Sequence, residues 1–175
     1  MPTIRLRLAQ PADLSTIMIL VAQAKKQLAQ AQISQWQDGY PQLTDFQSDL
    51  AQQRLYVLQR NQHLVGVASL LLTPEPNYRQ LLAGSWLTNS QAHYATIHRV
   101  CIDNHYSGQK LGQKLLSALL DEAKRLGFND VRIDTHHRNL RMQHVILQSG
   151  FKLAGTVQLN HDPQILRQVY QCLFV

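Results

Sequence analysis

The sequence predicts a single α/β domain over residues 1–175, built on a mixed sheet. Strand-like and helix-like segments alternate along the chain, and no repeat, low-complexity tract or linker interrupts them. A length of 175 residues is also ordinary for one domain with a substantial core.

The first segments are typical of a strand followed by a helix. Apolar and charged residues alternate from Ile4 to Leu8, which predicts a half-buried strand. Pro11 and Asp13 are typical of a helix start. The apolar residues that follow recur at helical spacing: Leu14, Ile17, Met18, Val21, Ala24 and Leu28.

The middle of the chain combines loops with a pair of strands. Asn61 and Gln62 separate two apolar runs, a pattern typical of a hairpin. A later section has prolines and no regular period, and irregular loops of that length often carry function. The predicted segments are an aromatic loop at Ser34–Thr44, a helix at Asp45–Gln53, strands at Leu55–Leu58 and Leu64–Leu70, and the irregular section Thr73–Gln91.

The C-terminal half predicts further strands and helices in alternation. One helix carries an apolar stripe from Leu111 to Leu126, and Gly127 directly after it is typical of a helix end. The predicted segments are strand Tyr94–Ile102, helix Gln109–Leu126, strand Val131–Asp134, helix Leu140–Ser149, and strands Phe151–Leu159 and Leu166–Phe174.

Composition excludes some classes of protein and narrows others. No apolar run approaches the ~18 residues of a membrane span, and the N-terminus lacks the apolar core of a signal peptide, so we expect a cytoplasmic protein without a membrane partner. Cys101 and Cys172 lie in strand-like segments and are expected to be buried, reduced thiols. Neither the cysteines nor the scattered histidines have metal-ligand spacing, so no metal site is expected.

The chain is basic, with a formal net charge of +6. Lysine and arginine are spread along the sequence, and no nucleic-acid motif accompanies them. A basic surface also attracts an anionic cofactor or an acidic substrate, and we favour that interpretation over nucleic acid.

The strand over residues 97–103, the glycine-bearing turn and the helix after it form the most informative stretch. The first N–H groups of a helix have no internal acceptor, and the helix dipole favours an anion there. Gly108 and Gly112 allow a ligand to approach the backbone, and Lys110 and Lys114 add positive charge. The pattern therefore predicts a site for a pyrophosphate-bearing cofactor.

These residues resemble the GCN5-related N-acetyltransferase (GNAT) family, and the resemblance covers essentially the whole chain. Residues 100–103 are similar to the family's strand that pairs with the pantetheine arm, and residues 108–113 to its pyrophosphate loop. Asn139, followed by a helix and Gly150-Phe151, resembles a further family segment. Trp36 to Pro41 and Gly84 to Trp86 are similar to small bacterial members.

The resemblance implies an acyl-CoA N-acyltransferase fold, with a mixed, mostly antiparallel central sheet flanked by helices. It also implies an acetyl-CoA-dependent N-acetyltransferase that moves an acetyl group to a primary amine of a small molecule or protein, by direct attack of the amine on the thioester. The residues that match the family's cofactor motifs are Val100, Cys101, Ile102, Gly108, Gln109, Lys110, Leu111, Gly112, Gln113 and Asn139.

The sequence departs from the family pattern at two places. Ser107 and Lys110 stand where the pyrophosphate loop usually has Arg or Gln and Gly. Ile146 stands where many members have a tyrosine that protonates the departing thiolate. The alternative function is therefore a catalytically weak protein that binds or senses acyl-CoA.

His98 is the candidate general base. It lies four residues before Ile102, on the same strand face if the period of two holds, and histidine titrates near neutrality. A structural histidine bonded to a carbonyl remains the alternative, and Thr96 is a second group that could orient a water. The N–H of Ile102 or a neighbour is the candidate donor to the acetyl carbonyl.

Other proton donors and the acceptor stay open. Tyr94 and Tyr106 are either proton donors for the thiolate or packing residues. Trp36, Tyr40 and Trp86 either line an acceptor pocket or form a secondary core. The expected partners are a small-molecule amine or a peptide acceptor, with no nucleic acid, and a homodimer is possible.

Overall fold

The computed structural model of the chain describes residues 2–89, 92–161 and 165–174. Its strands are hydrogen-bonded in the order β1-β2-β3-β5-β6-β8-β7-β4. The pair β5–β6 is parallel, whereas β1–β2, β2–β3, β6–β8, β7–β8 and β4–β7 are antiparallel. The predicted α/β fold with a mixed, mostly antiparallel sheet is confirmed.

The chain divides into two compact units, each described here by itself. The first unit comprises Met1–Leu70 and Arg99–Leu119, and the second comprises Leu71–His98 and Leu120–Val175. Strand β5, Ala95–Ile102, and helix α3, Leu111–Arg125, each run from one unit into the other. The single domain over residues 1–175 stays a prediction.

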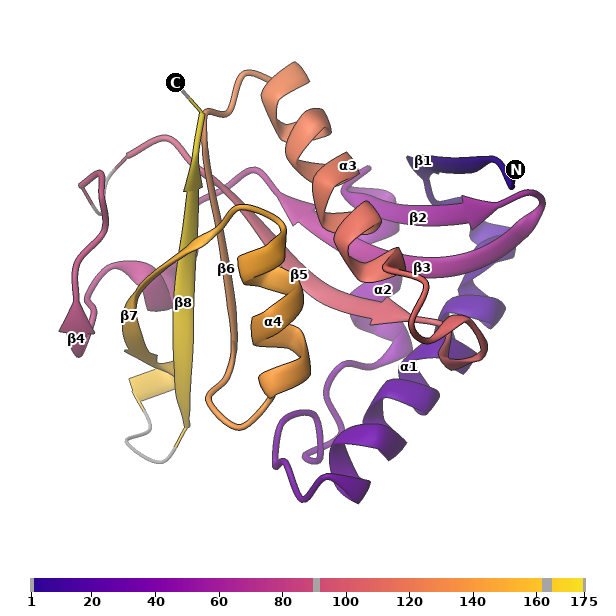
Figure 1. Cartoon of the computed structure of the whole chain (residues 1–175), viewed down its shortest axis with the longest axis horizontal. Helices are drawn as coiled ribbons and strands as arrows, with labels where there is room; N and C mark the ends of the chain where they lie inside the picture. The colour runs from indigo at the N-terminus through magenta and orange to yellow at the C-terminus, as the bar shows by residue number, and fades with distance from the viewer. Residues whose placement is uncertain (1, 90–91, 162–164, 175) are drawn as a thin grey trace. The chain divides into compact units, whose positions relative to one another are not determined.

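The first unit packs helices against a hairpin (Figure 1). Its remaining elements are β1 (Ile4–Leu8), η1 (Pro11–Asp13), α1 (Leu14–Gln30), α2 (Leu43–Ala51), β2 (Leu55–Arg60), β3 (His63–Leu71) and η3 (Asn104–Tyr106). Asn61, with φ of +56°, turns the chain between β2 and β3, as the hairpin pattern predicts.

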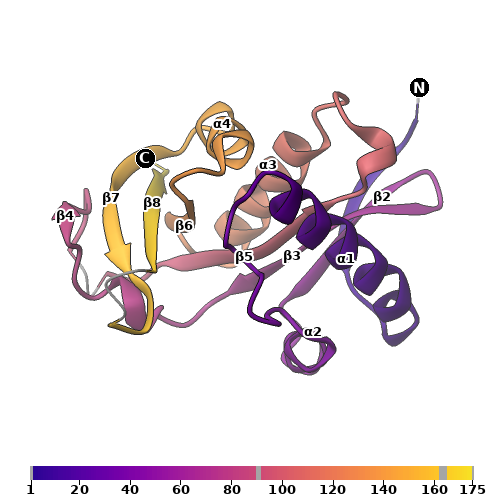
Figure 2. The same ribbon diagram turned by 90° about the horizontal axis from the view of Figure 1, so that it is seen from below.

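The core of the first unit lies where α1 and α2 pack on the same side of β2 and β3 (Figure 2). The register pairs Val57 with Val67, so both side chains point to one face of the hairpin. This cluster consists of Ile17, Leu20, Val21, Phe46, Leu55, Val57, Val67 and Cys101.

The second unit is built on strands that lie side by side in Figure 1. Its elements are η2 (Pro76–Tyr78), β4 (Ala83–Gly84), β6 (Asp130–His136), α4 (Leu140–Gln148), β7 (Lys152–Gln158), η4 (Leu159–His161) and β8 (Leu166–Leu173). A smaller core joins Tyr78, Tyr94, Val157 and Val169. Tyr78 and Trp86 therefore anchor the long segment before β5 to the sheet of this unit.

Most predicted elements are confirmed, and where the structure differs from the prediction the cause is local. The predicted irregular section at 73–91 contains η2 and the two-residue strand β4, whose Gly84 pairs with Gly155. A Cβ at Gly84 would lie 2.1 Å from the carbonyl oxygen of Ala154, so only glycine fits this close pairing. Residues 90–91 of that section lie outside the described residues.

Two helices begin at positions other than the predicted ones. Helix α2 begins at Leu43, two residues early, because Gln42 and Asp45 form a capping box. Helix α3 begins at Leu111 because Lys110 adopts a left-handed conformation, with φ of +56°. No helix among the described ranges is both long and apolar enough to cross a membrane.

Candidate functional site

The end of β5 presents backbone donors in the first unit. The N–H of Asp103 donates to the carbonyl of Val65 on β3, at 2.9 Å. Because consecutive N–H groups of a strand point to opposite edges, the N–H of Ile102 points away from β3. Ile102 thus has the orientation required of a backbone donor to a bound carbonyl.

Cys101 contributes its backbone to this segment, because its side chain belongs to the core. The side chain is 2% exposed, and burial raises the pKa of the thiol to about 12. Cys101 and Cys172 are both buried and free, as predicted. A thiol that stays protonated at neutral pH is a packing group, not a nucleophile.

The turn after η3 has the backbone shape that the sequence predicts for a phosphate loop. Gly108 has φ of +79°, and no atom lies within 4 Å of where its Cβ would be. Lys110 also has positive φ, so it follows the left-handed backbone conformation that glycine adopts most readily. Its side chain is exposed, so it leaves the backbone of the loop accessible.

The N-terminus of α3 supplies a cluster of unpaired donors. The first bond of the helix runs from the N–H of Lys114 to the carbonyl of Lys110, at 3.1 Å. The N–H groups of Leu111, Gly112 and Gln113 precede it and have no acceptor within the helix. No acidic residue lies in the first turn, and Lys110 and Lys114 are exposed. This donor set fits the pyrophosphate of a coenzyme A group.

Arg99 marks an irregularity within β5, with φ of +56°. Its Nη1 lies 2.7 Å from Oδ2 of Asp49, which is fully buried in α2. Arg54 and Ser69 also donate to the same carboxylate. Because Arg99 interrupts the regular alternation, the period-two argument for placing His98 and Ile102 on one face does not hold here.

His98 lies in the second unit, at the end of the part of β5 that pairs with β6. Its Nε2 lies 3.2 Å from Oε2 of Glu75, a residue of the segment just before η2. The two side chains are 19% and 15% exposed, so the pair is largely shielded from water. At Nε2, the neighbour of His98 is therefore a carboxylate and not the backbone carbonyl expected for a structural histidine.

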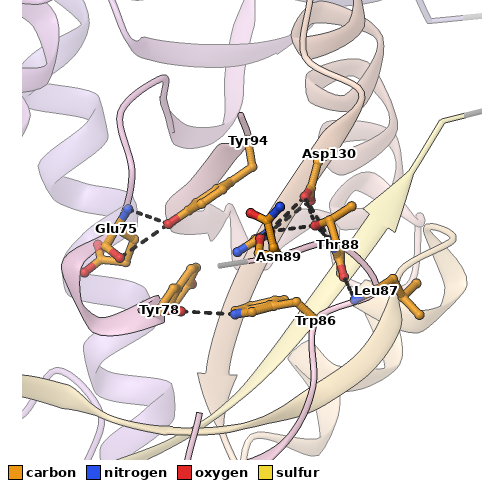
Figure 3. Close-up of polar contacts among 10 residues, drawn as sticks. Glu75, Tyr78, Trp86, Leu87, Thr88, Asn89, Tyr94 and Asp130 are labelled. Carbon is orange, nitrogen blue, oxygen red and sulfur yellow. Dashed lines mark hydrogen bonds and ion pairs between the residues drawn. The ribbon is translucent and has the colours of Figure 1, made fainter. Parts of the chain in front are cut away.

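Two neighbours hold Glu75 in place. Its backbone N–H donates to Oη of Tyr94 at 2.9 Å (Figure 3). Its Oε1 accepts from the backbone and side-chain nitrogens of Asn77. Burial raises the pKa of Glu75, but His98 and Asn77 outweigh it and hold the pKa below its ordinary value. The carboxyl group is therefore ionised at neutral pH.

Two buried tyrosines close this cluster, and the hydroxyl of each is engaged in a hydrogen bond. Tyr78 is fully buried and donates its hydroxyl to Oδ2 of Asp134 at 2.6 Å. Burial and the neighbouring Asp134 raise the pKa of Tyr78 well above its ordinary value. Burial likewise raises the pKa of Tyr94, whose hydroxyl is engaged with the backbone of Glu75.

Arg132 ties the loop before β5 to the sheet of the second unit. Its guanidinium carbon lies 4.1 Å from the ring centroid of Trp86 and 3.8 Å from that of Tyr94. Its Nη2 donates to Asp130 and to Thr88, and Figure 3 shows Thr88 and Asp130 facing each other. Trp86 is therefore part of a secondary core, one of the two roles expected for it.

The other aromatic candidates also pack. Trp36 lies against the core of the first unit, and the ring of Tyr40 lies 5.5 Å from the guanidinium carbon of Arg99. Tyr106, a candidate proton donor, has the guanidinium of Arg60 over its ring at 5.1 Å.

Asn139 begins α4 in the second unit. Its side chain accepts from the N–H of Met142 at 3.2 Å, so it is an N-cap. A few residues earlier, burial and nearby Arg167 lower the pKa of His136 to about 4. Further along α4, Ile146 is fully buried, so the position where the family often has tyrosine carries no proton donor.

The predicted site residues therefore fall into two groups. The first unit brings together Val100, Cys101, Ile102 and residues 108–113, whereas His98 and Asn139 lie in the second unit. Sequence reasoning missed Glu75 and Asp49. Glu75 is one of only two glutamates in the chain, and its place between two prolines was the signal available.

Comparison with known proteins identifies the family. A model of the acetyltransferase (GNAT) family matches residues 22–151. The chain belongs to the GNAT acetyltransferase family. No curated protein matches the sequence. A GNAT-family acetyltransferase from Streptococcus agalactiae 2603 is 31% identical, with a TM-score of 0.90 over 98% of this chain and 96% of that one.

More distant GNAT structures share the fold. The ribosomal-protein-alanine N-acetyltransferase of Brucella melitensis is 17% identical, with a TM-score of 0.70 over 97% of this chain and 99% of that one. A putative acetyltransferase from Salmonella typhimurium, solved with its cofactor acetyl-CoA, is 19% identical, with a TM-score of 0.65 over 97% and 93%.

Proposed function

We propose that this GNAT-family protein is an acetyl-CoA-dependent N-acetyltransferase that acts on a primary amine of a small molecule or a peptide. The observation that carries the proposal is the set of unpaired N–H donors at the start of α3, next to a left-handed turn and two exposed lysines. That set suits the pyrophosphate of the cofactor that the family uses.

The cofactor residues divide by role. Gly108, Gln109 and Lys110 form the turn, and Leu111, Gly112 and Gln113 offer N–H groups to phosphate oxygens. Val100, Cys101 and Ile102 offer strand backbone to the pantetheine arm, and the outward N–H of Ile102 stabilises negative charge at the acetyl oxygen. Asn139 is a weaker candidate contact, because its carbonyl oxygen already caps α4.

When bound, acetyl-CoA supplies an activated acetyl group as a thioester. The chain has to hold the acceptor amine beside it and remove a proton from the nitrogen. His98 is the proposed base, because it is partly shielded, lies on β5 and faces an ionised carboxylate.

A panel of amines tests this proposal. Purified protein with acetyl-CoA should release free thiol with at least one class among polyamines, aminoglycosides, amino acids and peptides with a free N-terminus. No release with any of them would overturn it.

The alternative function is an acyl-CoA-binding or sensing protein with little catalysis. The buried Ile146 favours it, since the proton donor common in the family is missing there. Acetyl-CoA binding without turnover across the amine panel would support this alternative, and turnover with any amine would exclude it.

The partner predictions are kept as proposals. We expect no nucleic-acid complex, and a salt-dependent gel shift with duplex DNA would contradict this. Cytoplasmic location and a homodimer stay predictions, the latter open to a measurement of mass in solution.

A further inference from the structure

Glu75 and His98 form a contact that no sequence pattern predicts. Nε2 of His98 lies 3.2 Å from Oε2 of Glu75. That nitrogen is buried, and the contact is at an ion-pair distance without the geometry of a hydrogen bond. Contacts of this kind in an enzyme without its ligands commonly tighten when the reacting groups are in place.

The carboxylate is held so that one oxygen is kept for the histidine. Oε1 accepts from N and Nδ2 of Asn77, at 3.1 and 2.9 Å. The backbone N–H of Glu75 is engaged with Oη of Tyr94. Oε2 is then the carboxylate oxygen that faces His98, so the contact at Nε2 involves one defined oxygen.

The other charged and titratable groups around the ring have their own partners. The ring of Tyr78 lies 6.5 Å from that of His98, and its hydroxyl donates to Asp134. On β6, Arg132 pairs with Asp130 at 2.9 Å. Glu75 is therefore the carboxylate that acts on His98 directly.

We propose that Glu75 is a positioning residue that keeps the hydrogen of neutral His98 on Nε2, so that Nδ1 carries the lone pair that takes the proton of the acceptor amine. The ionised carboxylate also stabilises the imidazolium that this transfer creates. The ring takes one proton from the amine nitrogen as the N–C bond forms and the C–S bond breaks. The leaving thiolate then takes up one proton from the imidazolium, so the ring ends neutral. This inference rests on the proposed function, in which His98 is the base.

NMR of protein that carries isotope-labelled histidine, recorded at several pH values, tests the pair without any turnover. The His98 ring is assigned by its absence from the spectrum of His98→Ala. In the native protein the neutral ring should carry its hydrogen on Nε2. In Glu75→Gln the tautomers should mix, since a neutral amide accepts from Nε2–H less strongly than a carboxylate does.

The chain offers a matched control in its other glutamate. Glu122 pairs with Arg125 on the surface of α3, so Glu122→Gln should leave the His98 tautomer unchanged. Gln at position 75 still accepts from Asn77, and thermal melting verifies that the variant folds. An unchanged tautomer in Glu75→Gln would overturn the inference.

Kinetics with a turned-over amine adds a second readout. Glu75→Gln should lower kcat about tenfold or more with little change in KM for acetyl-CoA. An unchanged kcat would also overturn the inference. If no amine is turned over, the proposed function fails, while the NMR experiment still decides whether Glu75 sets the tautomer.

Discussion

The segment from Val100 to Gln113 and the cluster around His98 differ in whether backbone or side-chain groups form them. The first relies on backbone: an outward strand N–H, a left-handed turn and the free donors of α3. The second relies on side chains that burial and hydrogen bonds hold in place. Backbone geometry suits an anion common to a whole family, whereas side-chain identity sets proton transfer, so substitutions should separate the two functions.

Replacing His98 should cause the largest loss. We expect His98→Ala to lower kcat/KM at neutral pH by about 10²–10⁴-fold, because it removes the proposed base. The affinity for acetyl-CoA should stay the same, measured by calorimetry. The matched control is His63→Ala, which removes an exposed histidine of β3 and should leave both quantities unchanged. A loss in kcat/KM of less than threefold would argue against His98 as the base.

Asp49 tests whether the irregularity in β5 depends on the buried ion pairs. Asp49→Asn should lower the free energy of unfolding by about 3 kcal/mol, since Arg54 and Arg99 would lose their buried counter-charge. Glu122→Gln, which removes a surface pair, should cost less than about 1 kcal/mol. Denaturant unfolding measures both, and equal effects would contradict a special role for Asp49.

His136 makes stability of the second unit depend on pH. Between pH 6.5 and about 4 the unfolded chain binds a proton at this ring that the folded chain does not. The free energy of unfolding should therefore fall by roughly 3 kcal/mol as pH drops through that window, and this contribution should level off below it. His136→Gln should flatten the fall, measured by denaturant unfolding at several pH values. An identical slope in the variant would contradict this assignment.

A carboxylate at the start of α3 should affect the cofactor region alone. Gly112→Asp should weaken acetyl-CoA binding about tenfold or more, because the new carboxylate repels phosphate. The helix itself should tolerate the change, because the helix dipole favours a negative charge near the N-terminus. Ser117→Asp places the same charge further along the helix, at an exposed position, and should change affinity little. Equal affinities for the two variants would place the pyrophosphate elsewhere.

The sequence predicts the backbone-built region better than the side-chain cluster. Gly108, the helix start and the strand end are adjacent in the chain, so local patterns reveal them. Glu75 reaches His98 only because η2 packs Tyr78 against Tyr94, a tertiary contact with no periodic signal. The left-handed Arg99 was equally hidden, because its conformation is held by Asp49 from a distant helix.

We propose that acetyl-CoA binds this chain at the end of β5 and the start of α3. Thermal melting with acetyl-CoA, and in parallel with ATP and duplex DNA, tests it most directly. At about 100 times its Kd, acetyl-CoA should stabilise the protein by ~2.7 kcal/mol and raise Tm by roughly 5–11 °C. Gly112→Asp should lose that rise at the same concentration. No rise with acetyl-CoA, or an equal rise in Gly112→Asp, would contradict acetyl-CoA binding at this position.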